Sequence, residues 1–186
     1  MNQTVLEILT EELSMEYFLR GLLPRILPSD YILDANCFIR THEGKSHLKK
    51  SIPKKINAYQ KFNYPVKVLI IHDQDSNDCL LLKQELLDLC HSIVPVPVMV
   101  RIACRELENW YFGDLKALKK VYPEINKVNS KSRNIDHFQG SYELERLTKK
   151  FSKTSAAREI SKYIDINNNL SPSFNQFVIG LGKFLT

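Results

Sequence analysis

The chain has 186 residues, of which 44% are hydrophobic, and its formal net charge is +5. This length suits one sizeable hydrophobic core and makes two independent domains unexpected. No run approaches the roughly 18 consecutive apolar residues of a membrane span, and the N-terminus lacks the basic start of a secretory signal. The four cysteines include no CxxC pair, which argues against a zinc knuckle or a disulfide framework. We therefore expect a cytoplasmic protein with no membrane association.

Charge is distributed unevenly along the chain. Up to Asp114 there are 13 basic and 15 acidic residues, a net charge of −2, whereas the remainder has 13 basic and 6 acidic residues, a net charge of +7. This asymmetry suits a metal site beside a surface that binds a polyanion, although a basic half can also simply serve solubility. We expect an α/β core over residues 1–114 and a helical C-terminal extension packed on it over residues 115–186.

Strands and helices are predicted to alternate through the first two thirds of the chain. A short apolar strand comes first, and the helix after it carries Tyr17, Phe18, Leu22 and Leu23 on one face. In chain order, the first elements are a strand over Thr4–Thr10, a helix from the N-cap Ser14 to Pro28, a strand over Tyr31–Arg40 and a helix from the N-cap Ser46 towards Tyr59.

The third predicted strand, Val66–Ile71, is apolar and β-branched, as is typical of a buried parallel strand. A helix follows from Asp78 to His91, and then a fourth strand over Ile93–Ile102, whose prolines confine its first half to an edge or an entry loop. After Asp114 the pattern is helical. The alternation predicts an α/β fold with a mainly parallel sheet of about four strands flanked by helices, where ligands bind outside the carboxyl ends of the strands.

Acidic residues follow the third strand directly. Asp73 and Asp75 are two residues apart, so their carboxylates can converge on one hard cation, and Mg²⁺ typically takes one or two carboxylates plus water and phosphate oxygens. The alternative is that these residues only cap the next helix, with Asp78 as its N-cap. We favour a metal site, because one cap suffices and crowded carboxylates repel unless a cation joins them. An EF-hand does not fit, since its sixth and twelfth positions would be Asp78 and Gln84.

More carboxylates follow the first and fourth strands. If the first and third strands are neighbours, Glu11 or Glu12 would face the aspartate pair and bind a second metal or act as general acid or base. Simple charge at a helix entry is the alternative for both. Glu106 and Glu108 could complete the acidic cluster. We expect Trp110 to anchor this segment in the core rather than stack on nucleic-acid bases.

Basic residues form several runs. Most such runs are solvated faces, but some would contact phosphates if the substrate is a nucleic acid. Our candidates for phosphate binding are Lys45, which follows the flexible Gly44, and Lys153.

These features together resemble a known family. The segments that carry the resemblance are Leu9–Leu19, His72–Asp75 and Arg105–Trp110, with further similar features at Gly44–Lys45, Asp114 and Ser171–Phe174. They look like the TOPRIM-like family known as domain of unknown function 4276. TOPRIM domains share a topoisomerase and primase fold, with a Glu after the first strand, matched here by Glu11, and an Asp-x-Asp after the third, matched by Asp73 and Asp75. The family usually has Gly after that Glu, where this chain has Glu12, so Glu12 is the alternative active carboxylate.

The resemblance implies phosphodiester chemistry that depends on Mg²⁺ or Mn²⁺, as in TOPRIM nucleases. It also implies nucleic acid as the substrate, DNA rather than RNA, and a bacterial antiviral defence system with an ABC- or SMC-type ATPase partner. The expected catalytic residues are Glu11, Asp73, Asp75, Glu106 and Glu108, of which Glu11, Asp73 and Asp75 would bind the metal, while Lys45 and Lys153 would bind phosphate.

Two rival interpretations remain. A TOPRIM-like scaffold could dock an ATPase and recognise nucleic acid or nucleotide without cutting. An Asp-x-Asp motif also occurs in haloacid-dehalogenase phosphatases, where the first Asp is a nucleophile. That family carries the motif on its first strand, followed by x-Thr or x-Val, whereas here Ser76-Asn77 follow it on the third. We rank this last reading lowest.

Overall fold

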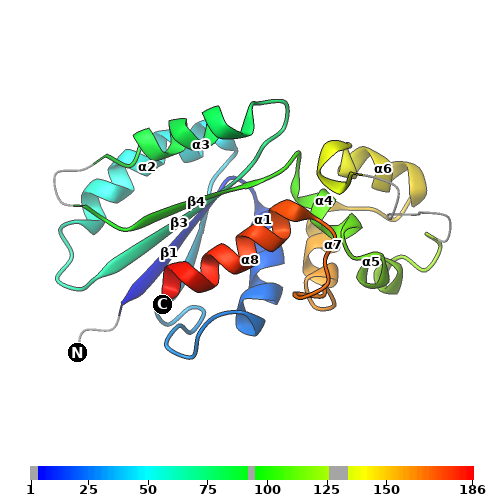
Figure 1. Ribbon diagram of the computed structural model, residues 1–186, viewed down its shortest axis with the longest axis horizontal. Helices are drawn as coiled ribbons and strands as arrows, with labels where there is room; N and C mark the ends of the chain where they lie inside the picture. Colours follow the sequence, from blue (N-terminus) through cyan, green and yellow to red (C-terminus); the bar gives the residue numbers. More distant parts are fainter. Residues whose placement is uncertain (1–3, 92–94, 126–133) are drawn as a thin grey trace.

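A four-stranded, all-parallel sheet forms the centre of the molecule (Figure 1). The computed structural model describes residues 4–91, 95–125 and 134–186. The strand order is β2-β1-β3-β4, so β1 and β3 are neighbours, as the metal-site hypothesis requires. The strands are β1 (Val5–Thr10), β2 (Cys37–Thr41), β3 (Val66–Asp73) and β4 (Val98–Ala103).

Helices cover both faces of the sheet. Figure 1 shows α2 and α3 on one face and α1 and α8 on the other. Their bounds are α1 (Leu13–Leu22), continued by the 3-10 turn η1 (Leu23–Arg25), α2 (Lys45–Tyr59), α3 (Cys79–Asp88) and α8 (Pro172–Leu185). The expected α/β class with a parallel sheet flanked by helices is thereby confirmed.

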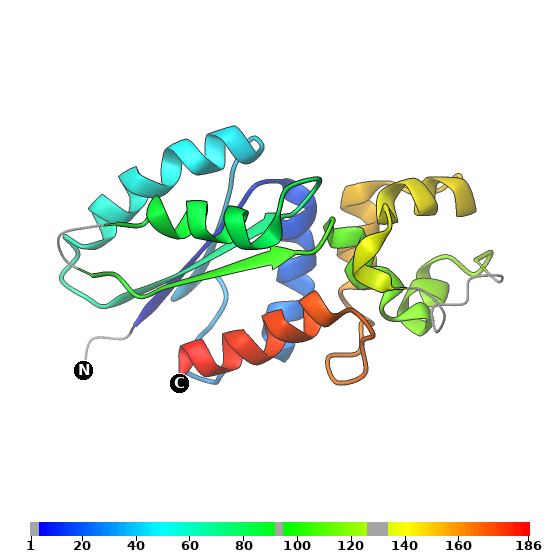
Figure 2. The same cartoon turned by 45° about the horizontal axis from the view of Figure 1, so that its top comes forward.

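The remaining helices lie beyond the carboxyl ends of the strands (Figures 1 and 2). They are α4 (Leu107–Phe112), α5 (Leu115–Val121), the 3-10 turn η2 (Ile135–His137), α6 (Gly140–Leu147) and α7 (Lys153–Ile160). The chain then returns to the sheet as α8. This arrangement puts part of the basic C-terminal extension against the edge of the sheet where ligands of parallel α/β folds bind.

The side chains of β3 alternate between two hydrophobic cores, one on each face of the sheet. Leu69 and Ile71 belong to the core shared with α1, α4 and α8, whereas Val68 and Ile70 belong to the core shared with α2 and α3. Because side chains of a strand alternate between faces, Asp73 has the same orientation as Leu69 and Ile71. Its carboxylate is therefore directed to the side on which α1 and α4 lie.

Trp110 is a core residue, as expected. Its side chain is fully buried and stacks on Phe177 of α8, with 5.3 Å between ring centroids. The indole Nε1 donates a hydrogen bond to Ser173 Oγ at 2.8 Å. A role in stacking bases does not agree with this burial.

Two helices start before the residues predicted to cap them. Ser14 is not the N-cap of α1, because the helix starts at Leu13 behind Glu12, and the Ser14 hydroxyl donates to the Glu12 carboxylate. Ser46 is not the N-cap of α2 either. That position belongs to Gly44, whose φ of 86° lies in the left-handed region that glycine adopts without strain. The N-cap Asp78 is confirmed, since its Oδ1 accepts from two backbone N–H groups of α3.

Strand boundaries also differ from the prediction. β2 starts only at Cys37, because Asp34 has φ 63° and the Asn36 side chain accepts from the Ile32 N–H, which closes a tight loop over the first half of the predicted strand. β4 starts after Pro97; residues 93–94 of the predicted strand lie outside the described ranges. Within those ranges, no helix has the length and apolar character needed to cross a bilayer.

Candidate metal-binding site

Asp73 is at the centre of the candidate site. It is the last residue of β3, which is two residues longer than predicted because Asp73 still pairs with Ala103 of β4. The residue is only 4% exposed, and its Oδ1 has no hydrogen-bond partner among the described residues. Burying a carboxylate oxygen without a hydrogen-bond partner costs folding free energy unless a proton or a cation accompanies it.

Glu108 faces the same interior space from α4. It is fully buried, and neither carboxylate oxygen has a hydrogen-bond partner in the part of the chain that the structure describes. Burial raises the pKa of Glu108 to about 7, against the lowering effect of Lys153. Burial, followed by the charges of Glu11 and Glu108, raises the pKa of Asp73 well above its ordinary value. The carboxylates of strand and helix therefore act on each other electrostatically.

Glu11, which follows β1, supplies the third buried carboxylate. Its Oε2 lies 3.3 Å from His72 Nδ1. That nitrogen is hydrogen-bonded to the Asp73 carbonyl, and burial lowers the pKa of His72, so a neutral ring that donates its Nδ1 proton to this carbonyl fits the geometry. Burial, Asp75 and Glu12 raise the pKa of Glu11 to about 7. Glu11 can thus hold or release a proton near neutral pH.

Asp75 has a different environment from Asp73. Its side chain is 40% exposed and forms an ion pair with Lys45, with 2.6 Å between Nζ and Oδ2. Its backbone is left-handed, with φ 53°, a region that Asp tolerates better than most residues. The Asp-x-Asp motif therefore consists of one buried carboxylate and one at the rim, held there by the first residue of α2.

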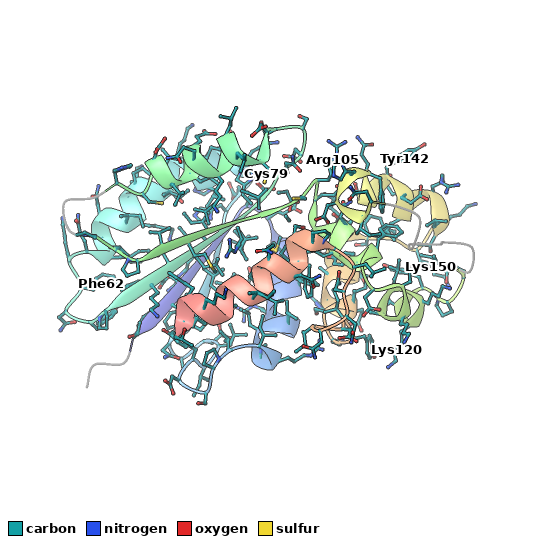
Figure 3. The ribbon with its side chains drawn as sticks, viewed as in Figure 1. Phe62, Cys79, Arg105, Lys120, Tyr142 and Lys150 are labelled. Atoms are coloured by element: carbon teal, nitrogen blue, oxygen red, sulfur yellow. The ribbon has the colours of Figure 1, made fainter. Side chains whose placement is uncertain are left out.

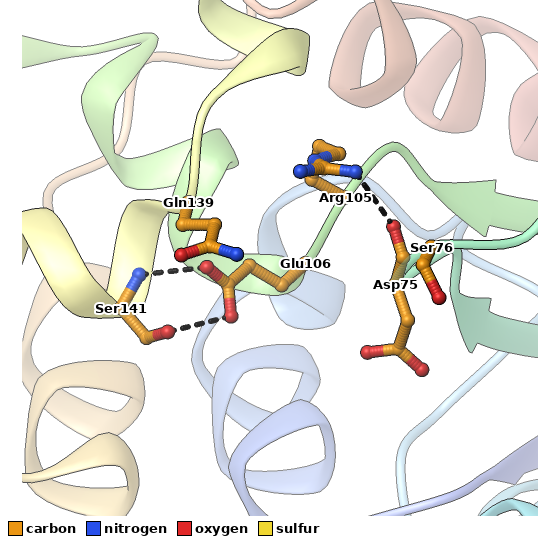
Figure 4. Close-up of a pocket in the computed structure, with 6 residues that line it drawn as sticks. All are labelled: Asp75, Ser76, Arg105, Glu106, Gln139 and Ser141. Carbon is orange, nitrogen blue, oxygen red and sulfur yellow. Dashed lines mark hydrogen bonds between the residues drawn. The ribbon is translucent and has the colours of Figure 1, made fainter.

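Two other predicted site residues make structural contacts. Glu106 accepts hydrogen bonds from the backbone N–H and the hydroxyl of Ser141, at 2.8 and 2.7 Å, in the first turn of α6 (Figure 4). Glu12 accepts from the Ser14 hydroxyl at 2.5 Å. Both carboxylates therefore already accept hydrogen bonds from neighbouring residues, which leaves Glu11 and Glu108 as the better candidates for ligand binding.

Lys153 is the cation of the cluster. It is the first residue of α7, and its Nζ lies 3.9 Å from Glu12 Oε1. Burial lowers the pKa of Lys153, but the charges of Glu108, Glu12 and Asp73 outweigh it, so the pKa is raised overall. The ammonium group stays charged at neutral pH beside the acidic residues.

Tyr111 is a site residue that the sequence analysis missed. It is fully buried, and its hydroxyl has no hydrogen-bond partner among the residues described. Burial, then the charges of Glu108 and Asp73, raises its pKa well above the ordinary value. Spacing could have revealed it, because residues three apart on a helix share a face and Tyr111 follows Glu108 by three.

A divalent cation fits the chemistry of this donor set. The described residues contain no group of three or more His, Cys, Asp or Glu side chains already arranged to hold a metal ion. However, the buried oxygens without hydrogen-bond partners in the described ranges include Glu11 Oε2, Asp73 Oδ1 and both oxygens of Glu108. Mg²⁺ needs only one or two carboxylates and completes its shell with water and phosphate oxygens, so an open set of this kind suits it better than a closed cage would.

A polar pocket of about 390 Å³ adjoins the carboxylates through Asp75 (Figure 4). Its lining residues are Asp75, Ser76, Arg105, Glu106, Gln139 and Ser141. They come from the loops after β3 and β4 and from the start of α6. The pocket therefore lies between the sheet and the helical extension.

Gly140 sets the distance between α6 and α4. A Cβ added at this glycine would meet the backbone and side chain of Glu108 and the backbone N of Asn109 at 2.9 Å. Real side chains do not approach that closely, so only glycine allows α6 to lie this near to the helix that carries Glu108.

A family model described as "Domain of unknown function (DUF4276)" matches residues 10–182. This match covers most of the chain, including every residue of the carboxylate cluster. No curated protein and no solved structure was matched. The chain belongs to the DUF4276 family.

Proposed function

We propose that this member of the DUF4276 family is a Mg²⁺- or Mn²⁺-dependent phosphodiesterase that cuts nucleic acid. The observation that carries the proposal is the cluster of buried carboxylates of Glu11, Asp73 and Glu108, in which Glu11 Oε2, Asp73 Oδ1 and both oxygens of Glu108 lack hydrogen-bond partners within the described ranges. Structural carboxylates in a protein interior are normally paired. Unpaired ones at the carboxyl ends of parallel strands are the feature expected of a cation and phosphate site.

In the proposed mechanism, Asp73 and Asp75 hold the cation, with Glu108 as a further ligand. The cation would supply Lewis acidity and charge neutralisation at the phosphate. Glu11 acts as general base, because a pKa of about 7 lets it take a proton from water at neutral pH and release it again. We assign Glu106 to anchoring α6 rather than to catalysis.

Lys45 and Lys153 have positioning roles in this proposal. Lys45 holds the rim carboxylate of Asp75 and would contact phosphate when Asp75 turns to the cation. Lys153 compensates part of the negative charge around Glu108 and Glu12 before the cation arrives. Both ammonium groups lower the electrostatic cost of bringing a polyanion to an acidic site.

The family resemblance extends the proposal to the setting. We propose that DNA is the preferred nucleic acid, that the protein works in the cytoplasm within an antiviral defence system, and that an ABC- or SMC-type ATPase is its partner. Co-expression with a neighbouring ATPase, followed by affinity purification, tests the partner directly.

Cleavage assays test the central proposal. Wild type, Asp73→Asn and the control Asp88→Asn are incubated with supercoiled and single-stranded DNA in Mg²⁺ or Mn²⁺. Asp88 is an exposed aspartate on α3, so its substitution matches the chemical change away from the site. We expect Asp73→Asn to lose at least about 100-fold in rate, since it removes a group that stabilises the transition state, and Asp88→Asn to lose nothing. Unchanged cleavage by Asp73→Asn would sink the assignment.

A second candidate function is a non-catalytic binding subunit of an ATPase complex. The low exposure of the cluster favours it, because Asp73 is 4% and Glu108 0% exposed, which restricts access of a large substrate to the carboxylates. This candidate predicts that wild type binds nucleic acid or the ATPase without cutting, and that Asp73→Asn leaves both interactions unchanged.

A further inference from the structure

Arg105 has an unusual backbone conformation for its residue type. Its φ is 63°, in the left-handed region that glycine and asparagine adopt readily and that bulky side chains avoid. Such conformations persist only where surrounding contacts enforce them, and they concentrate at functional sites. An observed outlier at the edge of the acidic site therefore calls for a functional reason.

The contacts that enforce this conformation connect two loops. The Arg105 N–H donates to Gln74 Oε1 at 3.0 Å, and the Arg105 carbonyl accepts from the Asp75 N–H at 2.7 Å. One residue before Asp75, the Gln74 N–H donates to the Ala103 carbonyl at 2.9 Å. The loops after β3 and β4 are thus held together, and the strain at Arg105 is coupled to the position of Asp75.

The guanidinium group is directed into open space between these loops and the helical extension. It donates one hydrogen bond, from Nη1 to the Asp75 carbonyl at 3.2 Å (Figure 4), and forms no ion pair with a carboxylate among the described residues. Figure 3 shows Arg105 at the junction of the sheet and the extension. Arg105 lines both the 390 Å³ pocket and a second pocket of about 590 Å³ that includes Gln74 and His137.

The carboxylates that line the first pocket are already engaged. Asp75 is paired with Lys45, and Glu106 holds Ser141. Arg105 is therefore an available cation in a polar pocket next to the acidic cluster. A planar guanidinium with several free N–H groups is the side chain best suited to two parallel hydrogen bonds with a phosphate.

We propose that Arg105 binds a phosphate of the nucleic-acid strand adjacent to the bond that is cut, in the pocket between Ser76 and Gln139. This inference rests on the proposed function, because it takes the carboxylate cluster as the place where the bond is cut. It assigns the pocket to the flanking nucleotide and makes Arg105 a binding residue. The proposal also explains why a strained arginine is kept at this position: Gly or Asn would relax the backbone but would lack the guanidinium that binds the phosphate.

Fluorescence anisotropy with labelled single-stranded and duplex DNA tests the proposal, with Ca²⁺ replacing Mg²⁺ so that binding is measured apart from cutting. The variants are Arg105→Asn, which tolerates the left-handed backbone without charge, Arg105→Lys, and the control Arg146→Gln on the exposed face of α6. We expect Arg105→Asn to weaken binding about tenfold and to reduce the salt slope by about one, with Arg105→Lys intermediate. Arg146→Gln should stay within about twofold of wild type.

Thermal unfolding separates binding from a structural role. If Arg105 is kept for its ligand, Arg105→Asn has an unchanged or higher Tm, because asparagine relieves the backbone strain. A lower Tm, binding equal to that of wild type, or an equal loss in Arg146→Gln overturns the inference.

Failure of the Arg105 phosphate site can be told apart from failure of the proposed phosphodiesterase activity. Binding by wild type that depends on Arg105, without any cleavage in Mg²⁺, retains the phosphate site and rejects the phosphodiesterase. Cleavage that is the same in wild type and Arg105→Asn retains the phosphodiesterase and rejects the phosphate site. Failure of wild type to bind either DNA form rejects this inference.

Discussion

Two glutamates of β1 and its end, Glu7 and Glu11, are four residues apart and both buried, yet their surroundings are opposite. Glu7 is 4% exposed and accepts hydrogen bonds from Arg40 Nε and Nη2 at 2.9 and 3.0 Å and from the Tyr59 hydroxyl at 3.0 Å. Glu11 is 9% exposed, and its Oε2 has no hydrogen-bond partner in the described part of the chain.

The difference separates a carboxylate that is fully paired within the fold from one that the proposed function assigns to the active site. Glu7 has a bidentate guanidinium and a phenol, which together compensate the cost of its burial. For Glu11, burial, followed by the charges of Asp75 and Glu12, raises the pKa to about 7. One buried glutamate of this strand is thus fully paired, whereas the one that follows the strand has a carboxylate oxygen without a hydrogen-bond partner among the described residues.

The largest effect on stability is expected for Glu7→Gln. The substitution weakens charge-assisted hydrogen bonds to Arg40, whose side chain is 45% exposed and can partly rehydrate, so we expect a loss of about 2 kcal/mol in the free energy of unfolding. Urea denaturation measures it. Glu11→Gln is the matched variant and should lose no stability while abolishing cleavage in Mg²⁺ or Mn²⁺, because it removes the proposed general base. Equal destabilisation by both substitutions would contradict the comparison.

A pH-dependent effect is expected for Glu108→Gln. The pKa of Glu108 is raised from 4.5 to about 7 in the folded protein, so wild type binds this proton more tightly than the unfolded chain does. The resulting stabilisation is complete below pH 4.5 and is lost as the pH rises through 7. Glutamine does not titrate, so Glu108→Gln should gain stability relative to wild type between pH 5 and pH 8, by roughly 2.5 kcal/mol.

Denaturation curves at both pH values check this difference. Glu145 provides a control, because it is an exposed residue of α6 and Glu145→Gln should show no comparable gain at pH 8. A stability difference that is independent of pH would mean that Glu108 does not titrate as its burial implies.

The smallest effect on stability is expected for Lys45→Gln. The Lys45–Asp75 ion pair is exposed, with 55% and 40% of the two side chains accessible, so its loss should cost under about 0.5 kcal/mol. Binding of DNA should nevertheless weaken severalfold if Lys45 contacts phosphate. A large drop in Tm would show instead that the pair holds the loop after β3 in place.

The sequence predicted the elements of the fold well where hydrophobic pattern alone decides them. The β-branched run before His72 became β3, and alternation of strands and helices predicted the parallel sheet. Element ends were less predictable. A serine resembles an N-cap wherever it stands, and only the path of the chain reveals that Gly44 and Glu12 occupy those positions instead.

The site was partly predictable for a similar reason. Topology brings Glu11 and Asp73 to one edge of the sheet, because both follow neighbouring parallel strands. The choice between Glu106 and Glu108 could not be made from spacing, since both lie at the start of α4 and only the position of α6 engages Glu106. Arg105 gave no signal, because its left-handed backbone depends on the loop it contacts.

The close approach of α6 to α4 at Gly140 has a consequence for evolution. Any side chain at this position would push apart the two helices and disturb the burial of Glu108. In an alignment of the family, position 140 should therefore be glycine in every member that retains a glutamate at position 108. Members that have lost that glutamate should be free to vary there, so co-variation of the two columns would identify which relatives keep the enclosed acidic site.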